Sequence, residues 1–111
     1  MAGKFELKKS KGGQFMFSLK AVNGKIILTS ELYKAKADAK GGIESVKKNA
    51  VNDAGYERKT SSKNEPYFVL KAVNGQIIGR SEMYSSASTM ENGIKSVKAN
   101  APDAVVKDMT V

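Results

Sequence analysis

The reactive side chains that enzymes use most often are missing from this chain. Its 111 residues include no histidine and no cysteine. Histidine is the usual general base near neutral pH and the commonest metal ligand, while cysteine supplies thiolate nucleophiles and metal thiolates. We therefore expect no catalytic residue, no metal ligand and no cofactor, and we expect that the protein is not an enzyme.

One polar set occurs twice. Ser30-Glu31 and Tyr33 are followed 51 residues later by Ser81-Glu82 and Tyr84. Two carboxylate–tyrosine pairs could bind a cationic or hydroxylated ligand. Serine and glutamate near a helix start also satisfy free amides and suit the helix dipole. Because a duplicated fold keeps the residues that folding requires, we favour the structural interpretation, in which this set caps the corner between a strand and a helix.

Two further carboxylates, those of Glu6 and Glu57, occupy equivalent places in predicted strands. If a symmetry axis brought them together they would form a dyad, in which like charges raise the pKa of one partner. Nothing in the sequence indicates such an approach, so the dyad is only the alternative interpretation of these residues.

The basic residues offer a second kind of chemistry. The net charge is +8, and residues 1–51 hold most of it, with eleven lysines against four acidic residues. An exposed sheet bearing basic and aromatic side chains can neutralise and stack on single-stranded nucleic acid. Such binding would depend strongly on salt, and the alternative is that the lysines only confer solubility. The candidate polyanion contacts, in the first loop and on the open sheet face, are Lys8, Lys9, Lys11, Lys20, Lys25, Tyr67, Lys71 and Arg80.

The elements that position these residues come in two copies. Across positions 17–50, 19 of 34 residues are identical to those found 51 positions later, without a gap. Solenoids usually need three or more repeats to bury a continuous core, and a unit of this size is near the lower limit for folding alone. We therefore expect one domain, residues 1–111, in which repeat 1 (residues 1–52) and repeat 2 (residues 53–111) share a core about a pseudo-two-fold axis.

Each repeat begins with the periodicity of strands. We expect first strands at residues 4–9 and 56–60, each followed by a hairpin. Asn23-Gly24 and its copy Asn74-Gly75 predict two-residue type I′ turns, since both residues tolerate positive φ. In that register the predicted core face carries Phe17, Leu19, Ala21, Ile26 and Leu28, and the opposite face carries Ser18, Lys20, Ile27 and Thr29.

Helical spacing follows in both repeats. Apolar residues recur every three or four positions, as Ala35, Ala39, Ile43, Val46 and Ala50, and then as Met90, Ile94, Val97 and Ala101. Ser85 is the predicted N-cap of the second helix. Gly42 and Gly93 fall on the buried stripes, where we expect each helix to approach the sheet closely. Residues 104–109 predict a closing strand.

The paired pattern resembles the YegP-like family, small bacterial and archaeal proteins of unknown function. The matching residues are Phe17–Ile27, Ser30–Tyr33 and Gly42–Ala50, with their second copies. The resemblance implies two β-β-β-α-β units in one sheet that exchange their last strands, so that residues 56–60 and 104–109 each pair across the pseudo-dimer. The first helix departs from the pattern, with Gly41 before Gly42 and Lys34 in place of a capping serine, so we expect it to be the less stable helix.

These observations predict an α+β fold with one mainly antiparallel sheet and two helices on one face. The function that we favour is a non-catalytic binding or interaction module with an unknown ligand. The alternative is a weak nucleic-acid or polyanion binder that acts through the lysine-rich first repeat. No apolar run is long enough for a signal sequence or membrane span, so we expect a cytoplasmic protein without membrane association, and a monomer because the two repeats are already fused.

Overall fold

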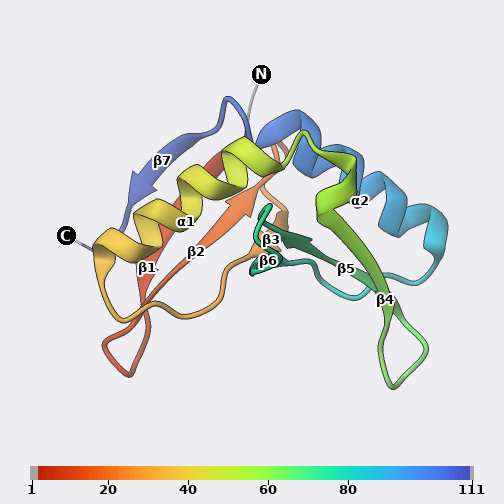
Figure 1. The fold of residues 1–111 in the computed structure, drawn as a ribbon, viewed down its shortest axis with the longest axis horizontal. Coiled ribbons are helices and arrows are strands. Elements are labelled where there is room, and N and C mark those ends of the chain that lie inside the picture. Colours follow the sequence, from red (N-terminus) through yellow and green to blue (C-terminus); the bar gives the residue numbers. More distant parts are fainter. Residues whose placement is uncertain (1–2, 111) are drawn as a thin grey trace.

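The computed structural model describes residues 3–110, which form one seven-stranded sheet and two helices (Figure 1). The strands lie in the order β4-β5-β6-β3-β2-β1-β7. The elements along the chain are β1 (Lys4–Lys9), β2 (Phe15–Lys20), β3 (Ile26–Thr29), α1 (Lys36–Asn49), a 3-10 turn (Asp53–Gly55), β4 (Tyr56–Thr60), β5 (Pro66–Lys71), β6 (Ile77–Arg80), α2 (Ala87–Asn100) and β7 (Val105–Asp108). The predicted fold class, with both helices over one face of a mainly antiparallel sheet, is confirmed.

The two repeats share one hydrophobic core. It is built from Phe5, Phe17 and Leu19 of the first repeat and from Phe68 and Leu70 of the second, all fully buried. Helix α1 packs on β1 and β2 of its own repeat and also on β5 and β6 of the other, while α2 packs on β5 and on β3. Each helix therefore covers strands from both repeats.

The hairpin turns differ from the predicted type. Gly24 has a φ of +85° and Gly75 a φ of +87°, whereas neither Asn23 nor Asn74 has positive φ. The amide of Gly24 donates to the carbonyl of Ala21 at 2.9 Å, and the register shifts between Leu19 and Lys20. This is a turn followed by a bulge at glycine, so the prediction of a type I′ turn is wrong.

A second irregularity, the register shift between Leu19 and Lys20, changes which residues reach the core. Leu28 lies opposite Leu19, but Ile26 lies opposite Lys20, so Ile27 is an extra residue in β3. Ile27 is consequently buried in the core, although it was predicted on the opposite face, and Ile26 is only half-buried. Phe17, Leu19 and Leu28 are buried as predicted.

Both helices approach the sheet at a glycine, as predicted. A Cβ added to Gly42 would lie 2.5 Å from the hydroxyl oxygen of Tyr33 and 2.9 Å from a ring carbon of Phe17. At Gly93 the added atom would meet Tyr84 and Phe68 in the same way. Tyr33 stacks on Phe17 and Tyr84 on Phe68, each with ring centroids 6.3 Å apart. A tyrosine thus fills the space beside each glycine.

The two helices start differently. The N-cap of α2 is Ser86, one residue after the predicted Ser85, and it forms a capping box with Thr89. The N-cap of α1 is Ala35, whose side chain makes no capping hydrogen bond. The helices end alike, because Asn49 and Asn100 each donate to the carbonyl four residues earlier, at 2.8 Å.

The last strand belongs to the opposite half of the sheet. β7 runs parallel to β1, with Glu6 opposite Lys107 and Leu7 opposite Asp108. This confirms the exchange predicted for residues 104–109. β4 pairs with β5 only, which lies within the second repeat when the chain is divided after residue 52. Neither helix is long and apolar enough to cross a bilayer in the part of the chain that the structure describes.

Candidate interaction surface

The sheet face away from the helices carries one buried carboxylate. Phe5 and Leu7 point into the core, so Glu6 between them points to the open face. Its side chain is only 6% exposed, because three lysines cover it. The ammonium nitrogen of Lys20 lies 3.0 Å from the carboxylate, and those of Lys8 and Lys4 lie 3.6 and 3.7 Å away. The hydrogen bond from Lys20, outweighing the opposing effect of burial, lowers the pKa of Glu6.

The equivalent carboxylate in the second repeat is less enclosed. Glu57 in β4 pairs with Lys71 and, at 3.7 Å, with Lys59, and its side chain is 42% exposed. The hydrogen bond from Lys71 lowers its pKa. Four strands separate β1 from β4, which places Glu6 and Glu57 about 24 Å apart at ~4.8 Å per strand. The alternative interpretation of Glu6 and Glu57 as a carboxylate dyad is therefore wrong.

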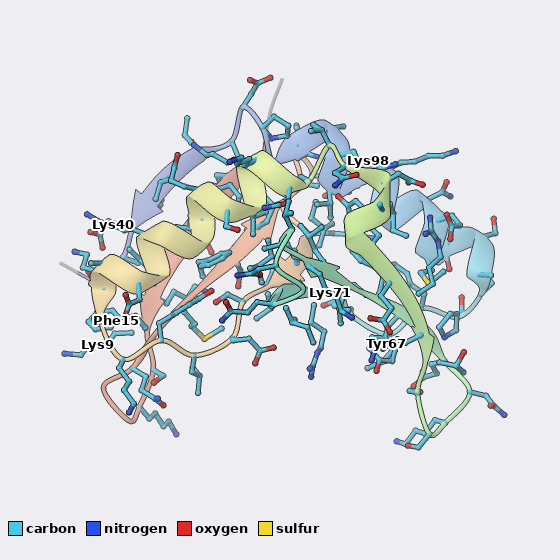
Figure 2. All side chains as sticks on the ribbon, viewed as in Figure 1. Lys9, Phe15, Lys40, Tyr67, Lys71 and Lys98 are labelled. Carbon is cyan, nitrogen blue, oxygen red and sulfur yellow. The ribbon has the colours of Figure 1, made fainter. Side chains whose placement is uncertain are left out.

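The candidate polyanion contacts are spread over both halves of the sheet. Figure 2 labels three of them: Lys9 lies in one half, and Tyr67 and Lys71 lie in the other. Four of the candidates lie next to carboxylates: Lys8 and Lys20 at Glu6, Lys71 at Glu57, and Arg80, 3.8 Å from Glu31. The ammonium group of Lys9 lies 5.9 Å from the centre of the Phe15 ring. Lys11 and Lys25 are exposed in loops, and Tyr67 is half-buried in β5. Four of the seven basic candidates thus lie beside a carboxylate, and polyanion contact stays a prediction.

The repeated serine-glutamate set lies at the joint between the repeats. The hydroxyl of Ser30 accepts a hydrogen bond from the amide of Phe17 and donates to the carbonyl of Glu31, at 2.9 and 2.7 Å. Ser81 makes the same two bonds in the second repeat. The serines therefore hold β2 to the end of β3, and β5 to the end of β6, instead of capping a helix. A shallow hollow of about 210 Å³ lies between them, lined by Thr29, Ser30, Glu31, Arg80, Ser81 and Glu82.

Three tyrosines and two carboxylates of the sheet and its borders have shifted pKa values. Burial raises the pKa of Tyr33, of Tyr84 and, most strongly, of Tyr56, whose hydroxyl donates to the carbonyl of Ala50 at 2.7 Å. Lysine partners lower the pKa of Glu6 and Glu57. These shifts all move the groups away from neutrality, the opposite of what a general acid or base requires.

The feature that sequence reasoning missed is the outer edge of β4. Among residues 3–110 no strand pairs with that edge, whereas β7 covers the equivalent edge of β1. The edge is bordered by an ion pair in which two nitrogens of Arg58 donate to the two carboxylate oxygens of Glu91, at 2.6 and 3.0 Å. Arg58 stands where repeat 1 has the buried Leu7. That replacement was a signal in the sequence, since a charged residue at a core position is typical of an edge strand.

A family model now accounts for the duplication. It is described as a domain of unknown function (DUF1508), and it matches the chain twice, over residues 10–57 and 61–108. The chain belongs to the DUF1508 family. If the chain is divided at the bounds of these two matches, the first unit ends within β4 and the second unit ends with β7. Counted this way, β4 pairs with β5 of the other unit, as the family resemblance implied for residues 56–60.

Whole-length relatives support the same assignment. The UPF0339 protein YegP of Yersinia pestis is 54% identical over 109 residues, which cover 98% of this chain and 97% of the relative. A UPF0339 protein of Bordetella pertussis is 57% identical over 110 residues, covering 99% and 98%. The predicted resemblance to the YegP-like family is confirmed.

Two solution NMR structures show the same fold. The yegP protein of E. coli, described as a protein of unknown function, superposes with a TM-score of 0.94 at 55% identity, covering 99% of this chain and 95% of that one. A UPF0339 protein of Shewanella oneidensis superposes with a TM-score of 0.93 at 52% identity, covering 99% and 93%.

Proposed function

We propose that this DUF1508 protein is a non-catalytic interaction module, and that the outer edge of β4 is its docking surface. The observation that carries the proposal is the asymmetry of the sheet. Its two halves share one framework, yet β7 covers the edge of β1 and no described strand covers the edge of β4. An uncovered edge presents unpaired amides and carbonyls, which can bind a segment of another protein.

The chemistry of the side chains supports a role without catalysis. The chain has neither histidine nor cysteine. Its shifted carboxyl and tyrosine groups have pKa values further from neutrality than usual. An active site would instead need a group whose pKa is moved toward the working pH.

Site-specific photo-crosslinking in living cells tests the docking surface. A photoreactive amino acid at Thr60, on the edge of β4, is expected to form a discrete adduct with another protein. The same amino acid at Lys63, in the exposed loop after β4, serves as the control and is expected to give none. An adduct pattern that is identical at the two positions would contradict the proposal.

An edge-blocked variant sharpens this test. In Arg58→Pro the amide that points away from the sheet is lost, a change that edge strands tolerate. The matched control Arg58→Ala loses the ion pair with Glu91 but keeps the amide. We expect the adduct at Thr60 to disappear in Arg58→Pro and to persist in Arg58→Ala, with both variants shown to be folded by their amide NMR spectra.

A second candidate function is weak binding of nucleic acid or another polyanion by the first repeat. It is favoured by Lys9, Lys11 and Lys25, which have no carboxylate within ion-pair distance among residues 3–110. Gel-shift titrations at low and moderate salt test it, with Lys→Gln at these three positions as the variant. Affinity for RNA or single-stranded DNA that is no greater than for heparin, and that vanishes near physiological salt, would exclude specific nucleic-acid binding.

A further inference from the structure

The pairing of β7 with β1 shows how this fold accepts an added strand. The strand runs parallel to β1, and the amide of Met109 donates to the carbonyl of Leu7 at 2.9 Å. On the helix side, Val106 lines a hollow with Lys40, Ile43 and Glu44 of α1. At the end of the strand, Asp108 forms an ion pair with Lys36, also on α1. Backbone pairing and one ion pair thus hold these four residues in place.

The outer edge of β4 offers the equivalent backbone groups. Arg58 is the counterpart of Leu7 at the offset of 51 residues. In an antiparallel ladder alternate residues direct their amides and carbonyls to opposite sides, so those of Tyr56, Arg58 and Thr60 point outward. The amide of Tyr56 already donates to the carbonyl of Asp53. The free edge therefore begins at the carbonyl of Tyr56 and continues through Arg58 to Thr60.

The side chains show what is missing beside β4. Glu6 and Glu57 are the same residue at the same position, yet the exposed fraction of the side chain rises from 6% to 42%. Glu6 has Lys107 of the added strand opposite it, and Lys4 on its own strand. Glu57 has no added strand, and glycine replaces Lys4 in the second repeat. A basic residue on an incoming strand would supply the cover that Glu57 lacks.

Arg58 indicates a second property of a strand that could bind beside β4. Its side chain is 39% exposed, and Glu91 occupies only two of its five N–H donors. Asp108 of β7 lies opposite Leu7, the counterpart of Arg58. An acidic residue at the same place on an incoming strand could accept hydrogen bonds from the remaining N–H donors of Arg58.

We propose that the outer edge of β4 binds an extended peptide segment as a parallel strand, with a basic residue opposite Glu57 and an acidic residue opposite Arg58. The inference rests on the proposed function and specifies the ligand of that site. A second copy of this chain fits the edge less well. Antiparallel pairing of two β4 strands about their centre places Arg58 opposite Arg58 of the second copy, and like charges directly opposite one another are unfavourable.

The chain's own last strand is a suitable probe, because it has the required order of a basic and an acidic residue. A synthetic peptide of residues 104–111 is titrated into the ¹⁵N-labelled full-length protein, and amide shifts are followed by NMR. We expect saturable shifts along β4 and the adjoining turns of α2, with β1 unchanged because its tethered β7 occupies that edge. A control peptide with Met109→Pro lacks the amide that would meet the carbonyl of Arg58, and it is expected to cause no such shifts.

A charge exchange tests the register. Glu57→Lys is expected to weaken the native peptide about fivefold, and a peptide carrying Lys107→Glu is expected to recover that loss on the variant protein. Equal affinities in all four combinations would overturn the register. Amide shifts confined to β1 and α1 would overturn peptide binding at the edge of β4. Amide shifts of β4 that depend on protein concentration in the absence of peptide would also overturn it, and they would indicate self-association.

The two proposals fail in different ways. A photo-adduct at Thr60 together with no peptide shifts at millimolar concentration would refute the parallel peptide and leave the interaction module in place. Loss of the adduct and of the peptide shifts would refute both.

Discussion

Thr29 and Arg80 occupy the same position in the two repeats, and they pair with each other where β3 meets β6. The pseudo-two-fold axis therefore passes between them. They form the one residue pair in the described ladder between β3 and β6. The halves of the sheet thus share little backbone pairing at their joint. Further contact between the repeats comes from α1, which packs on β5 and β6, from α2, which packs on β3, and from β7, which pairs with β1.

This joint predicts that the first repeat cannot fold by itself as a monomer. Residues 1–52 contain α1 but lack β5 and β6, on which α1 also packs. They also lack β7, which covers β1. We expect the isolated segment to be unfolded or dimeric, as judged by circular dichroism and sedimentation equilibrium. A folded monomer would contradict the shared core.

The glycines beneath the tyrosines should be intolerant of a single methyl group. Gly93→Ala places a Cβ against Tyr84 and, at 3.3 Å, against Phe68. We expect it to lower the free energy of unfolding by about 1–3 kcal/mol, since overpacked cores must move side chains or backbone. Urea denaturation gives the measurement.

Two further variants isolate the cause. Gly41→Ala adds a methyl group in open space on α1, and it is expected to stabilise the protein by up to about 1 kcal/mol through helix propensity. In Gly93→Ala with Tyr84→Phe the nearest oxygen is gone, and part of the lost stability should return. Equal effects of Gly41→Ala and Gly93→Ala would show that propensity alone matters at these positions.

The duplicated sequence predicted much of the fold because both copies carry the same periodicity. The strands at residues 4–9 and 56–60 and the apolar stripes of both helices are local patterns, and these were found. The exception is Ala35, which was predicted on the buried stripe and is the exposed N-cap of α1. The type of the hairpin turn was predicted wrongly, because an Asn-Gly pair suits two turn geometries. Here the side-chain oxygen of Asn23 accepts from the amide of Lys25 at 3.0 Å, which favours a bulge at Gly24 without positive φ at asparagine.

The candidate site was harder to predict because it depends on strand order. Glu6 and Glu57 occupy equivalent positions in the sequence, and their surroundings differ because β7 pairs with β1 and because Gly55 stands where the first repeat has Lys4. Which edge an exchanged strand covers is a long-range property that periodicity does not encode. The replacement of Leu7 by Arg58 was the single local trace of the open edge.

The unequal helix caps give a paired prediction. Ser86→Ala removes the side chain that accepts from the amide of Thr89 at 3.2 Å, and it should cost about 1 kcal/mol. Ala35→Ser offers α1 the cap it lacks and should stabilise the protein by a similar or smaller amount. Thermal unfolding of the two variants and of the wild type provides the comparison. If Ala35→Ser is neutral while Ser86→Ala destabilises, the start of α1 has no need of a cap.

The attachment of β7 should weaken in acid. The ion pair with Lys36, followed by hydrogen bonds from Thr110, lowers the pKa of Asp108 strongly. A lowered pKa in the folded state means that this support is present above the pKa of the unfolded chain and is lost as the pH falls through the folded value. We expect the amide of Met109 to exchange faster with solvent in Asp108→Asn and in Lys36→Gln. Unchanged hydrogen exchange in both variants would show that the backbone ladder alone holds the strand.

The buried carboxylate of Glu6 should make the stability of the whole protein depend on pH. Because Lys20, Lys8 and Lys4 surround it and its pKa is below the usual 4.5, Glu6 stabilises the folded state at neutral pH and ceases to do so as the pH falls through its lowered folded value. Glu6→Gln removes the charge and leaves three lysines close together, so we expect a loss of about 1–2 kcal/mol at pH 7. The difference from wild type should shrink steadily below about pH 4.5 in urea titrations. Glu57→Gln is the matched control, and its effect should be smaller because that side chain is far more exposed. A Glu6→Gln effect that stays constant between pH 7 and pH 3 would mean that packing, and not charge, makes this residue stabilising.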